Sequence, residues 1–167
     1  MAEIDFLVVG HITKDLHGAR YTLGGAATYA AITARNLGLR AGIFTSHGPD
    51  VNLKLLAGIE IVAVPAPVTT TFQNVYSRGA RSQYVRAVAA RLTADALPAG
   101  WTDVPLAVLA PVAKEVQWLF QVKLDRSMLA LAPQGWMRLW DESGRVSRAP
   151  WLWNPYGNVR LITVSTE

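Results

Sequence analysis

Two adjacent glycines, Gly24 and Gly25, stand directly before a run of small residues that is closed by Gly38. Glycine has no side chain, so the backbone at such a pair can approach a ligand closely. The first N–H groups of a helix have no intrahelical acceptor and favour a polar or anionic group. The pair therefore predicts a binding site at the start of a helix.

The sequence offers little for other kinds of catalysis. It has no cysteine, which excludes disulfides, thiolate ligands and a cysteine nucleophile, and which fits a reducing cytoplasm. His11, His17 and His47 show none of the spacings of a metal site, so we expect no bound metal. No serine stands in a G-x-S-x-G motif, and no G-x-x-x-x-G-K-[ST] motif provides a nucleotide site.

The composition favours one soluble globular domain over residues 1–167. The chain is 51% apolar, and a chain of this length buries about 70% of its unfolded surface. The formal net charge is +4, but the basic residues are scattered, which argues against a nucleic-acid partner. No apolar run approaches the roughly 18 residues of a membrane span, and the first residues lack the basic segment of a signal peptide. We therefore expect no membrane partner and a cytoplasmic location.

The elements that must position the glycine pair follow from hydrophobic patterning. Residues 6–9 form a short apolar run closed by Gly10, which is typical of a strand buried on both faces of a parallel sheet. Residues 25–37 place small apolar side chains on one face at helical spacing, and Gly38 ends this helix. Residues 41–45 then predict a second strand, which completes a β-α-β crossover.

Two further regions complete the predicted fold. Short β-prone runs between residues 59 and 90 predict a small mixed or antiparallel sheet beside the main one. Strand, helix and strand then alternate again at residues 105–110, 113–124 and 128–132. Two short strands around a turn at 141–144 follow, and residues 159–164 predict one more buried strand. The fold class is therefore α/β, a layered Rossmann-type domain with a mainly parallel sheet, flanking helices and a small β-sheet lid.

The strand at residues 6–9, the turn containing Asp15 and the double-glycine helix together resemble the amino-terminal half of the ribokinase-like, or PfkB, family of carbohydrate kinases. The order of elements agrees over nearly the whole chain, with the small sheet in the place of the family's lid. The resemblance implies that Asp15 holds hydroxyl groups of a sugar and that the backbone of Gly24 and Gly25 lines the sugar pocket. A carboxylate accepts two hydroxyl hydrogen bonds at once, and a glycine turn lets a polyol approach without a clash.

Weaker points of resemblance imply further substrate contacts. Tyr29 stands where many family members have an asparagine that contacts the sugar. An aromatic ring at this place suits a nucleoside or a modified sugar alcohol as an alternative to a simple sugar. Thr71 and Asn74 lie in the predicted lid strand and Gln134 at a strand end near the pocket, and by position all three are predicted as polar contacts.

The family's catalytic machinery has no counterpart in this sequence. In the family, a glycine-rich turn supplies an anion hole for the transferred phosphate together with a catalytic aspartate, and an Asn-x-x-Glu motif is associated with magnesium. The sequence lacks that turn, and it ends at Glu167, where the Asn-x-x-Glu motif would follow the last predicted strand. We therefore expect an acceptor-binding half that is incomplete at its carboxyl end. ATP and Mg²⁺ are the family's cofactors, and we do not expect this chain alone to bind them productively or to transfer phosphate.

Two alternatives compete with this interpretation. A dinucleotide-binding domain shares the strand, the glycine turn and the helix, but here the glycines follow the strand too late for the tight turn that holds a pyrophosphate. The second alternative is a non-catalytic remnant or binding module that self-associates across an uncovered sheet edge, which predicts a homodimer.

Overall fold

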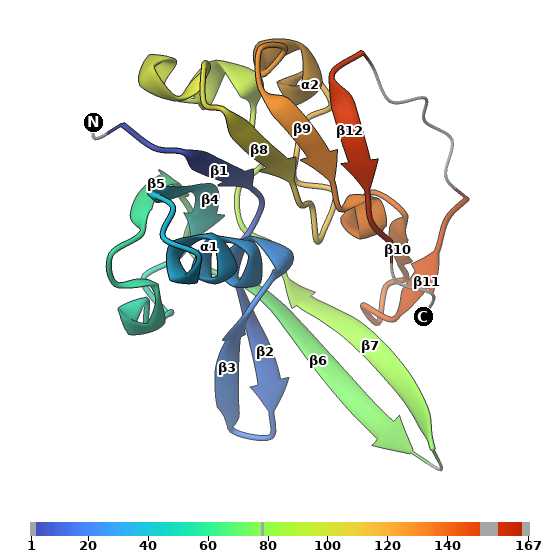
Figure 1. Ribbon diagram of the computed structural model, residues 1–167. Helices are drawn as coiled ribbons and strands as arrows, with labels where there is room; N and C mark the ends of the chain where they lie inside the picture. Colours follow the sequence, from blue (N-terminus) through green and yellow to red (C-terminus); the bar gives the residue numbers. More distant parts are fainter. Residues whose placement is uncertain (1–2, 78, 151–156, 165–167) are drawn as a thin grey trace.

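The computed structural model describes residues 3–77, 79–150 and 157–164 (Figure 1). Its main sheet has six parallel strands in the described part of the chain, in the order β12-β9-β8-β1-β4-β5. These strands are β1 (Phe6–Val9), β4 (Ala41–His47), β5 (Glu60–Pro65), β8 (Leu106–Leu109), β9 (Met128–Leu131) and β12 (Val159–Ile162). The predicted layered α/β domain with a mainly parallel sheet is thus confirmed.

Strand β1 lies at the centre of this sheet because its residues are apolar toward both faces. Val8 is fully buried on the face that is covered by helix α1 (Ala26–Asn36). The helix packs closely there through small side chains, of which Ala27 and Ala31 are fully buried. Leu7 and Val9 are fully buried on the opposite face. The predicted β-α-β crossover, which runs from β1 through α1 to the parallel strand β4, is therefore confirmed.

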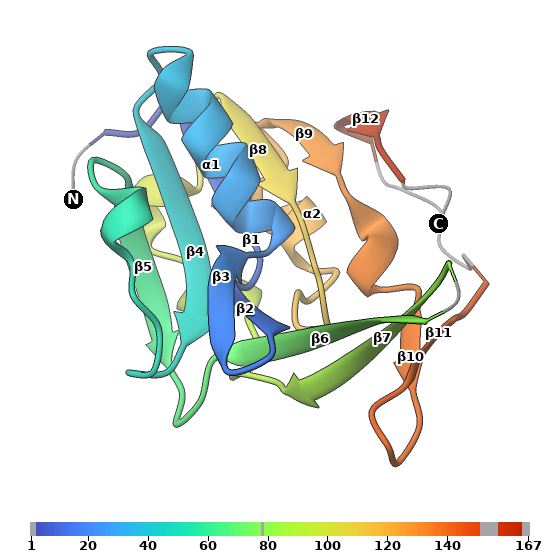
Figure 2. The ribbon, with the colours of Figure 1, turned by 90° about the horizontal axis from the view of Figure 1, so that it is seen from below.

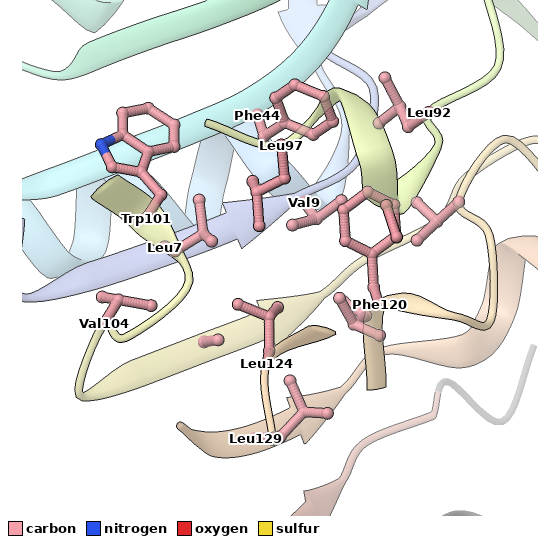
Figure 3. Packing of buried hydrophobic residues seen from close by; sticks show 14 of the residues in the cluster. Leu7, Val9, Phe44, Leu92, Leu97, Trp101, Val104, Phe120, Leu124 and Leu129 are labelled. Carbon is pink, nitrogen blue, oxygen red and sulfur yellow. The ribbon is translucent and has the colours of Figure 1, made fainter. Parts of the chain in front are cut away.

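The second face of the sheet is covered by loops and short helices instead of a long helix. Figure 3 shows Trp101 and Phe120 packed against this face, near Leu7 and Val9 of β1 and Phe44 of β4. Trp101 lies in a short 3-10 helix (Ala99–Trp101), and Phe120 begins the four-residue helix α2 (Phe120–Lys123). The core on this side therefore depends on a few large side chains.

Replacing the largest of these side chains is expected to destabilise the fold strongly. Trp101 is fully buried, so Trp101→Ala leaves a large cavity and should lower the free energy of unfolding by about 3–5 kcal/mol. Urea unfolding followed by circular dichroism measures the change. Trp118→Ala is the matched control, because Trp118 is 41% exposed and less contact is lost. Equal losses for the two variants would contradict this description of the core.

The small sheet stands at the carboxyl ends of the central strands (Figure 1). Its strands are β2 (Thr13–His17), β3 (Arg20–Gly24), β6 (Thr70–Ser77) and β7 (Ala80–Ala87), in the order β3-β2-β6-β7. β2 pairs in parallel with β6, and the other two pairings are antiparallel. The predicted mixed β-sheet is therefore present, but it draws two of its strands from residues 13–24.

This pairing corrects two predictions. Asp15 was expected in a turn, but it lies inside β2, because residues 13–17 pair with β3 on one side and with β6 on the other. The turn of the β2–β3 hairpin falls instead at Gly18, whose φ is +61°. Residues 60–65 were expected in the small sheet, but they form β5, the edge strand of the main sheet beside β4. Pro65 ends this strand, as expected of a residue that cannot donate a ladder hydrogen bond.

Two other predicted elements also differ. The helix expected over residues 113–124 is reduced to α2, because residues 115–117 are extended and exchange backbone hydrogen bonds with Leu92. Lys114, with a φ of +61°, interrupts any helix there. The strand expected at residues 159–164 is present as β12, but it is an exposed sheet edge and is not buried.

A hairpin of two short strands, β10 (Arg138–Trp140) and β11 (Val146–Arg148), lies beside β7 (Figure 2). The turn between them was predicted: the Asp141 carboxylate accepts hydrogen bonds from the backbone N–H groups of Ser143 and Arg145, both at 2.9 Å. The hairpin is joined to the small sheet by a hydrogen bond from the Val85 N–H to the Gly144 carbonyl (2.8 Å). In the described part of the chain, no helix is long and apolar enough to cross a membrane.

Candidate functional site

A cavity of about 290 Å³ opens between the start of α1, the small sheet and the segments that follow β8 and β9. Ligands of α/β proteins bind outside the carboxyl ends of the parallel strands, and this cavity occupies that position. Its described lining residues are Thr13, Asp15, Gly25, Ala26, Tyr29, Phe72, Asn74, Arg81, Gln83, Pro111, Val112, Ala132, Gln134, Arg138 and Thr163.

A Cβ at either glycine of the predicted site would overlap a neighbouring group, but the two neighbours differ. Gly24 ends β3 opposite Thr13, and a Cβ added to it would overlap Asp15 Oδ2. Gly25 begins α1 with a φ of +91°, and a Cβ there would overlap the carbonyl oxygen of His11. Gly24 therefore lies against the Asp15 carboxylate, and Gly25 lines the cavity at the start of the helix, whereas Gly24 is not among the described lining residues.

Asp15 points into this cavity from the middle of β2. Its side chain is half-buried, and its Oδ1 accepts a hydrogen bond from Thr13 Oγ1 at 3.2 Å. Burial raises the pKa of Asp15 above the ordinary 3.8, while the Thr13 hydrogen bond and the positive charges of His17, Arg138 and Arg81 oppose the rise. The carboxylate keeps unused lone pairs for hydroxyl donors.

The structure brings together most of the other predicted contacts. Tyr29 lies one turn into α1 and lines the cavity with 58% of its surface exposed. Asn74 lines it from β6, and its Oδ1 accepts hydrogen bonds from Arg81 Nε (3.0 Å) and Gln83 Nε2 (3.2 Å). Gln134 lines it from a 3-10 turn (Pro133–Gly135) that directly follows β9.

Thr71 lies outside this group. Side chains alternate between the faces of a strand, and Phe72 and Asn74 line the cavity from the other face of β6. The Thr71 hydroxyl is buried and donates a hydrogen bond to the carbonyl oxygen of Thr69 at 2.8 Å. Thr71 is therefore not among the residues that line the cavity.

Several lining residues were not predicted, above all Arg81 and Arg138. Arg138 donates a hydrogen bond from Nη1 to the carbonyl oxygen of Val112 (2.7 Å) and lies over the Phe72 ring at 4.9 Å from its centre. Burial lowers the pKa of Arg138. Arg81 pairs with Tyr76 in the β6–β7 hairpin, two residues from Asn74 and therefore on the same face of the sheet. No local pattern marks Arg138, which comes from a hairpin far along the chain.

Two buried titratable side chains, Glu115 and His11, connect the backbone segments beside the cavity through hydrogen bonds. The Glu115 carboxylate accepts hydrogen bonds from the backbone N–H groups of His11, Val112 and Ala113 at 2.6–3.0 Å. The His11 ring donates from Nε2 to the Ala90 carbonyl (2.8 Å) and accepts at Nδ1 from the Thr70 hydroxyl (2.7 Å). Burial lowers the pKa of His11, while the charge of Glu115 opposes this. The described residues contain no cluster of three side chains that could hold a metal ion.

Comparisons with known proteins agree with the fold. No protein-family model matches the sequence, and no curated protein matches it either. Among solved structures, a pyrophosphate-dependent kinase in the ribokinase family, complexed with a pyrophosphate analog and myo-inositol, superposes with a TM-score of 0.71 at 21% identity. The match covers 86% of this chain and 54% of that one.

Two other kinases of known structure are similar at lower scores. Arabidopsis thaliana ribokinase, complexed with ribose and ATP, gives a TM-score of 0.55 at 15% identity over 78% of this chain and 54% of its own. The nucleoside kinase of Methanocaldococcus jannaschii gives 0.56 at 16% identity over 80% of this chain and 54% of its own. The chain therefore has the ribokinase fold, as the sequence resemblance implied, and it spans about half the length of these kinases.

Proposed function

We propose that this chain binds the hydroxyl-bearing acceptor of a ribokinase-type kinase, which is a sugar, a nucleoside or a polyol. The observation that carries the proposal is the convergence of the Asp15 carboxylate and the glycine helix start on one cavity. At about 290 Å³, this cavity lies at the lower end of the range for small-molecule sites. The similar structures named above hold myo-inositol and ribose, which supports a ligand of this size and chemistry.

The cavity offers complementary groups for such a ligand. Asp15 accepts hydrogen bonds from neighbouring hydroxyls, and its Thr13 contact fixes the direction of the carboxylate. Asn74 supplies an amide group from β6, and Gln134 supplies one from the turn after β9. The Tyr29 ring gives an apolar surface for one face of the ligand. We propose that β6 and β7 exclude water from the bound acceptor.

The proposed reaction of a complete enzyme is phosphorylation of an acceptor hydroxyl by ATP or pyrophosphate with Mg²⁺. Such a transfer needs a general base and donors that stabilise the moving phosphate. The described residues do not fit a metal site, and the sequence has no glycine-rich aspartate turn. We therefore propose that this chain orients the acceptor and does not by itself transfer phosphate.

Binding and turnover separate these proposals. Isothermal calorimetry with myo-inositol, ribose and adenosine tests acceptor binding, and phosphate or ADP release from pyrophosphate or ATP with Mg²⁺ tests transfer. We expect saturable binding of at least one acceptor without turnover. Turnover by the purified chain would refute the non-catalytic proposal, and the absence of any binding would refute the acceptor site.

Self-association is the second proposal, and the edge of the main sheet favours it. β12 is the last strand of the described sheet, with Leu161 60%, Ile162 44% and Val164 53% exposed. An uncovered apolar edge promotes pairing with another chain. We propose a homodimer through β12, to be tested by sedimentation. Leu161→Lys should shift the chain to monomer, and an unchanged mass would contradict this interface.

Acceptor binding should depend on pH through Asp15. Because burial raises its pKa, Asp15 takes up a proton at a higher pH than an ordinary aspartate does, and the neutral acid is a poorer acceptor. Acceptor affinity should therefore fall as pH is lowered from about 7 toward 4. Calorimetry across this range measures the effect. Affinity that stays constant over the range would mean that the ionised carboxylate is not used.

A further inference from the structure

Asp15 and Phe72 are direct neighbours on the small sheet. They are register partners on the parallel strands β2 and β6, so their side chains lie on the same face. Both side chains line the cavity of the candidate site. Asp15 is half-buried, and Phe72 is only 3% exposed. The carboxylate therefore stands beside a buried aromatic ring, where water and salt screen charges less than they do at the surface.

The guanidinium group of Arg138 reaches this face of the small sheet from β10. Its Cζ lies 4.9 Å from the centre of the Phe72 ring. Its Nη1 donates a hydrogen bond to the carbonyl oxygen of Val112 at 2.7 Å, and Arg138 also lines the cavity. One contact to the small sheet and one to the segment after β8 thus fix a half-buried positive charge over the neighbour of Asp15.

A half-buried guanidinium group needs negative charge nearby, because burial disfavours the charged form. Burial lowers the pKa of Arg138, the charges of Glu115 and Asp15 oppose this, and the charge of Arg81 adds to it. The Glu115 carboxylate already accepts hydrogen bonds from backbone N–H groups. Asp15 is the one carboxylate among the described residues that line the cavity. Within the cavity, Asp15 is therefore the counter-charge of Arg138.

Arg138 differs from the other charged groups around Asp15 in its burial. The titratable or charged side chains that face Asp15 are His17 from its own strand, Tyr29 from α1, Arg81 from β7 and Arg138 from β10. Its register partners on β3 and β6 are uncharged. His17 and Arg81 are exposed, so solvent screens them, and histidine side chains are largely uncharged at neutral pH. Arg138 acts on Asp15 from a position with less water around it.

We propose that Arg138 is a positioning residue of the acceptor site, and that its fixed charge holds Asp15 in the ionised form that accepts hydrogen bonds from hydroxyl groups. This inference rests on the proposed function, because it assigns Arg138 to the binding of the same acceptor. The ionised carboxylate accepts with both oxygens, whereas the neutral acid must also place a proton. The β10–β11 hairpin thereby extends acceptor binding to lower pH.

The first test follows Asp15 in the free chain, without any acceptor. Carbon NMR of chain labelled with ¹³C-aspartate gives the pH midpoint at which the Asp15 carboxyl takes up its proton. Arg138→Gln removes the nearby positive charge and should raise this midpoint by about one pH unit. Arg138→Lys keeps the charge and should leave the midpoint near its original value. Arg126→Gln is the control, because Arg126 is exposed and pairs with Asp103, and it should change nothing.

The second test measures acceptor affinity against pH by calorimetry with myo-inositol, ribose and adenosine. Near pH 8, where Asp15 is ionised in both chains, Arg138→Gln should bind within about twofold of the unmodified chain. On the acid side of the midpoint its affinity should be about tenfold lower, because less of the carboxylate is ionised. A loss of the same size at every pH would mean that Arg138 contacts the acceptor directly, and it would overturn the positioning role.

The failures of the two proposals are distinguishable. Acceptor binding together with an unchanged Asp15 midpoint in Arg138→Gln would overturn this inference and leave the proposed function standing. A raised midpoint in a chain that binds no acceptor would refute the acceptor site and, with it, the role given to Arg138. Circular dichroism and urea unfolding check that each variant is folded. Arg138→Met, whose uncharged side chain can still pack on Phe72, should raise the midpoint equally and serves if Arg138→Gln does not fold.

Discussion

Asp15→Asn should weaken acceptor binding about 100-fold while the chain stays folded. Two hydroxyl hydrogen bonds to a charged group contribute about 1.5 kcal/mol each at the lower end of the usual range, and each 1.4 kcal/mol corresponds to about tenfold in the dissociation constant. The amide keeps the shape of the side chain, but one oxygen is replaced by an NH₂ group that cannot accept, and the remaining oxygen loses the negative charge that strengthens its hydrogen bond. Because burial raises the pKa of Asp15, the ionised side chain is a burden on the folded state that the neutral amide removes.

The measurement is calorimetric titration with the best acceptor, paired with urea unfolding of the same samples. Stability equal to or above that of the unmodified chain is expected at neutral pH, and this would separate a binding defect from a folding defect. Asp103→Asn is a suitable control, because Asp103 is exposed, pairs with Arg126 and does not line the cavity. Unchanged affinity in Asp15→Asn would contradict the role given to the carboxylate.

Gly24→Ala should strongly lower the affinity for the acceptor, because the new methyl group displaces the Asp15 carboxylate. Gly24 has no left-handed φ, so the backbone accepts an alanine there. The new methyl group would overlap Asp15 Oδ2 and stand 2.8 Å from Thr13 Oγ1, so the carboxylate must turn away. We expect an affinity loss of the same order as in Asp15→Asn, about 100-fold, since the same hydrogen bonds are lost.

A double-mutant cycle gives this prediction its sharpest form. If Gly24→Ala acts by displacing the carboxylate, it should have little further effect on affinity in a chain that already carries Asp15→Ala. Gly38→Ala, at the far end of α1, is the control. Its φ of +86° makes it costly for stability, but nothing lies within 4 Å of its new methyl group, so affinity should be unchanged. Additive losses in the cycle would mean that the two residues act separately.

The amino-terminal part of the fold was predictable because its signals are local. Each signal is contained in one short stretch of sequence: the apolar run in β1, the small residues in α1, and Gly38 just after the end of that helix. The small sheet was less predictable, because β2 pairs with β6 across more than fifty residues, and this pairing together with the β2–β3 hairpin places Asp15 in a strand. In the same way, Leu92 fixes residues 115–117 in an extended form that no local pattern marks.

The site shows the same division between local and distant information. The sequence resemblance pointed to seven residues, and five of them line one cavity: Asp15, Gly25, Tyr29, Asn74 and Gln134. Gly24 and Thr71 are not among its described lining residues. The face presented by Thr71 could not be derived without the register of β6, which turns Phe72 toward the cavity instead. Arg81 and Arg138 were not predicted, because they come close together only through the packing of the β10–β11 hairpin against β7.

The most direct test of the central claim is a titration of ¹⁵N-labelled chain with myo-inositol and ribose, followed by amide NMR. The account predicts saturable shifts for at least one of these ligands at the amides of Asp15, Gly25 and Ala26, with Asn74 and Gln134 responding at the same ligand concentration. The pattern should disappear in Asp15→Asn. Saturable shifts confined to residues outside this cavity, or no shifts with any ligand, would contradict it.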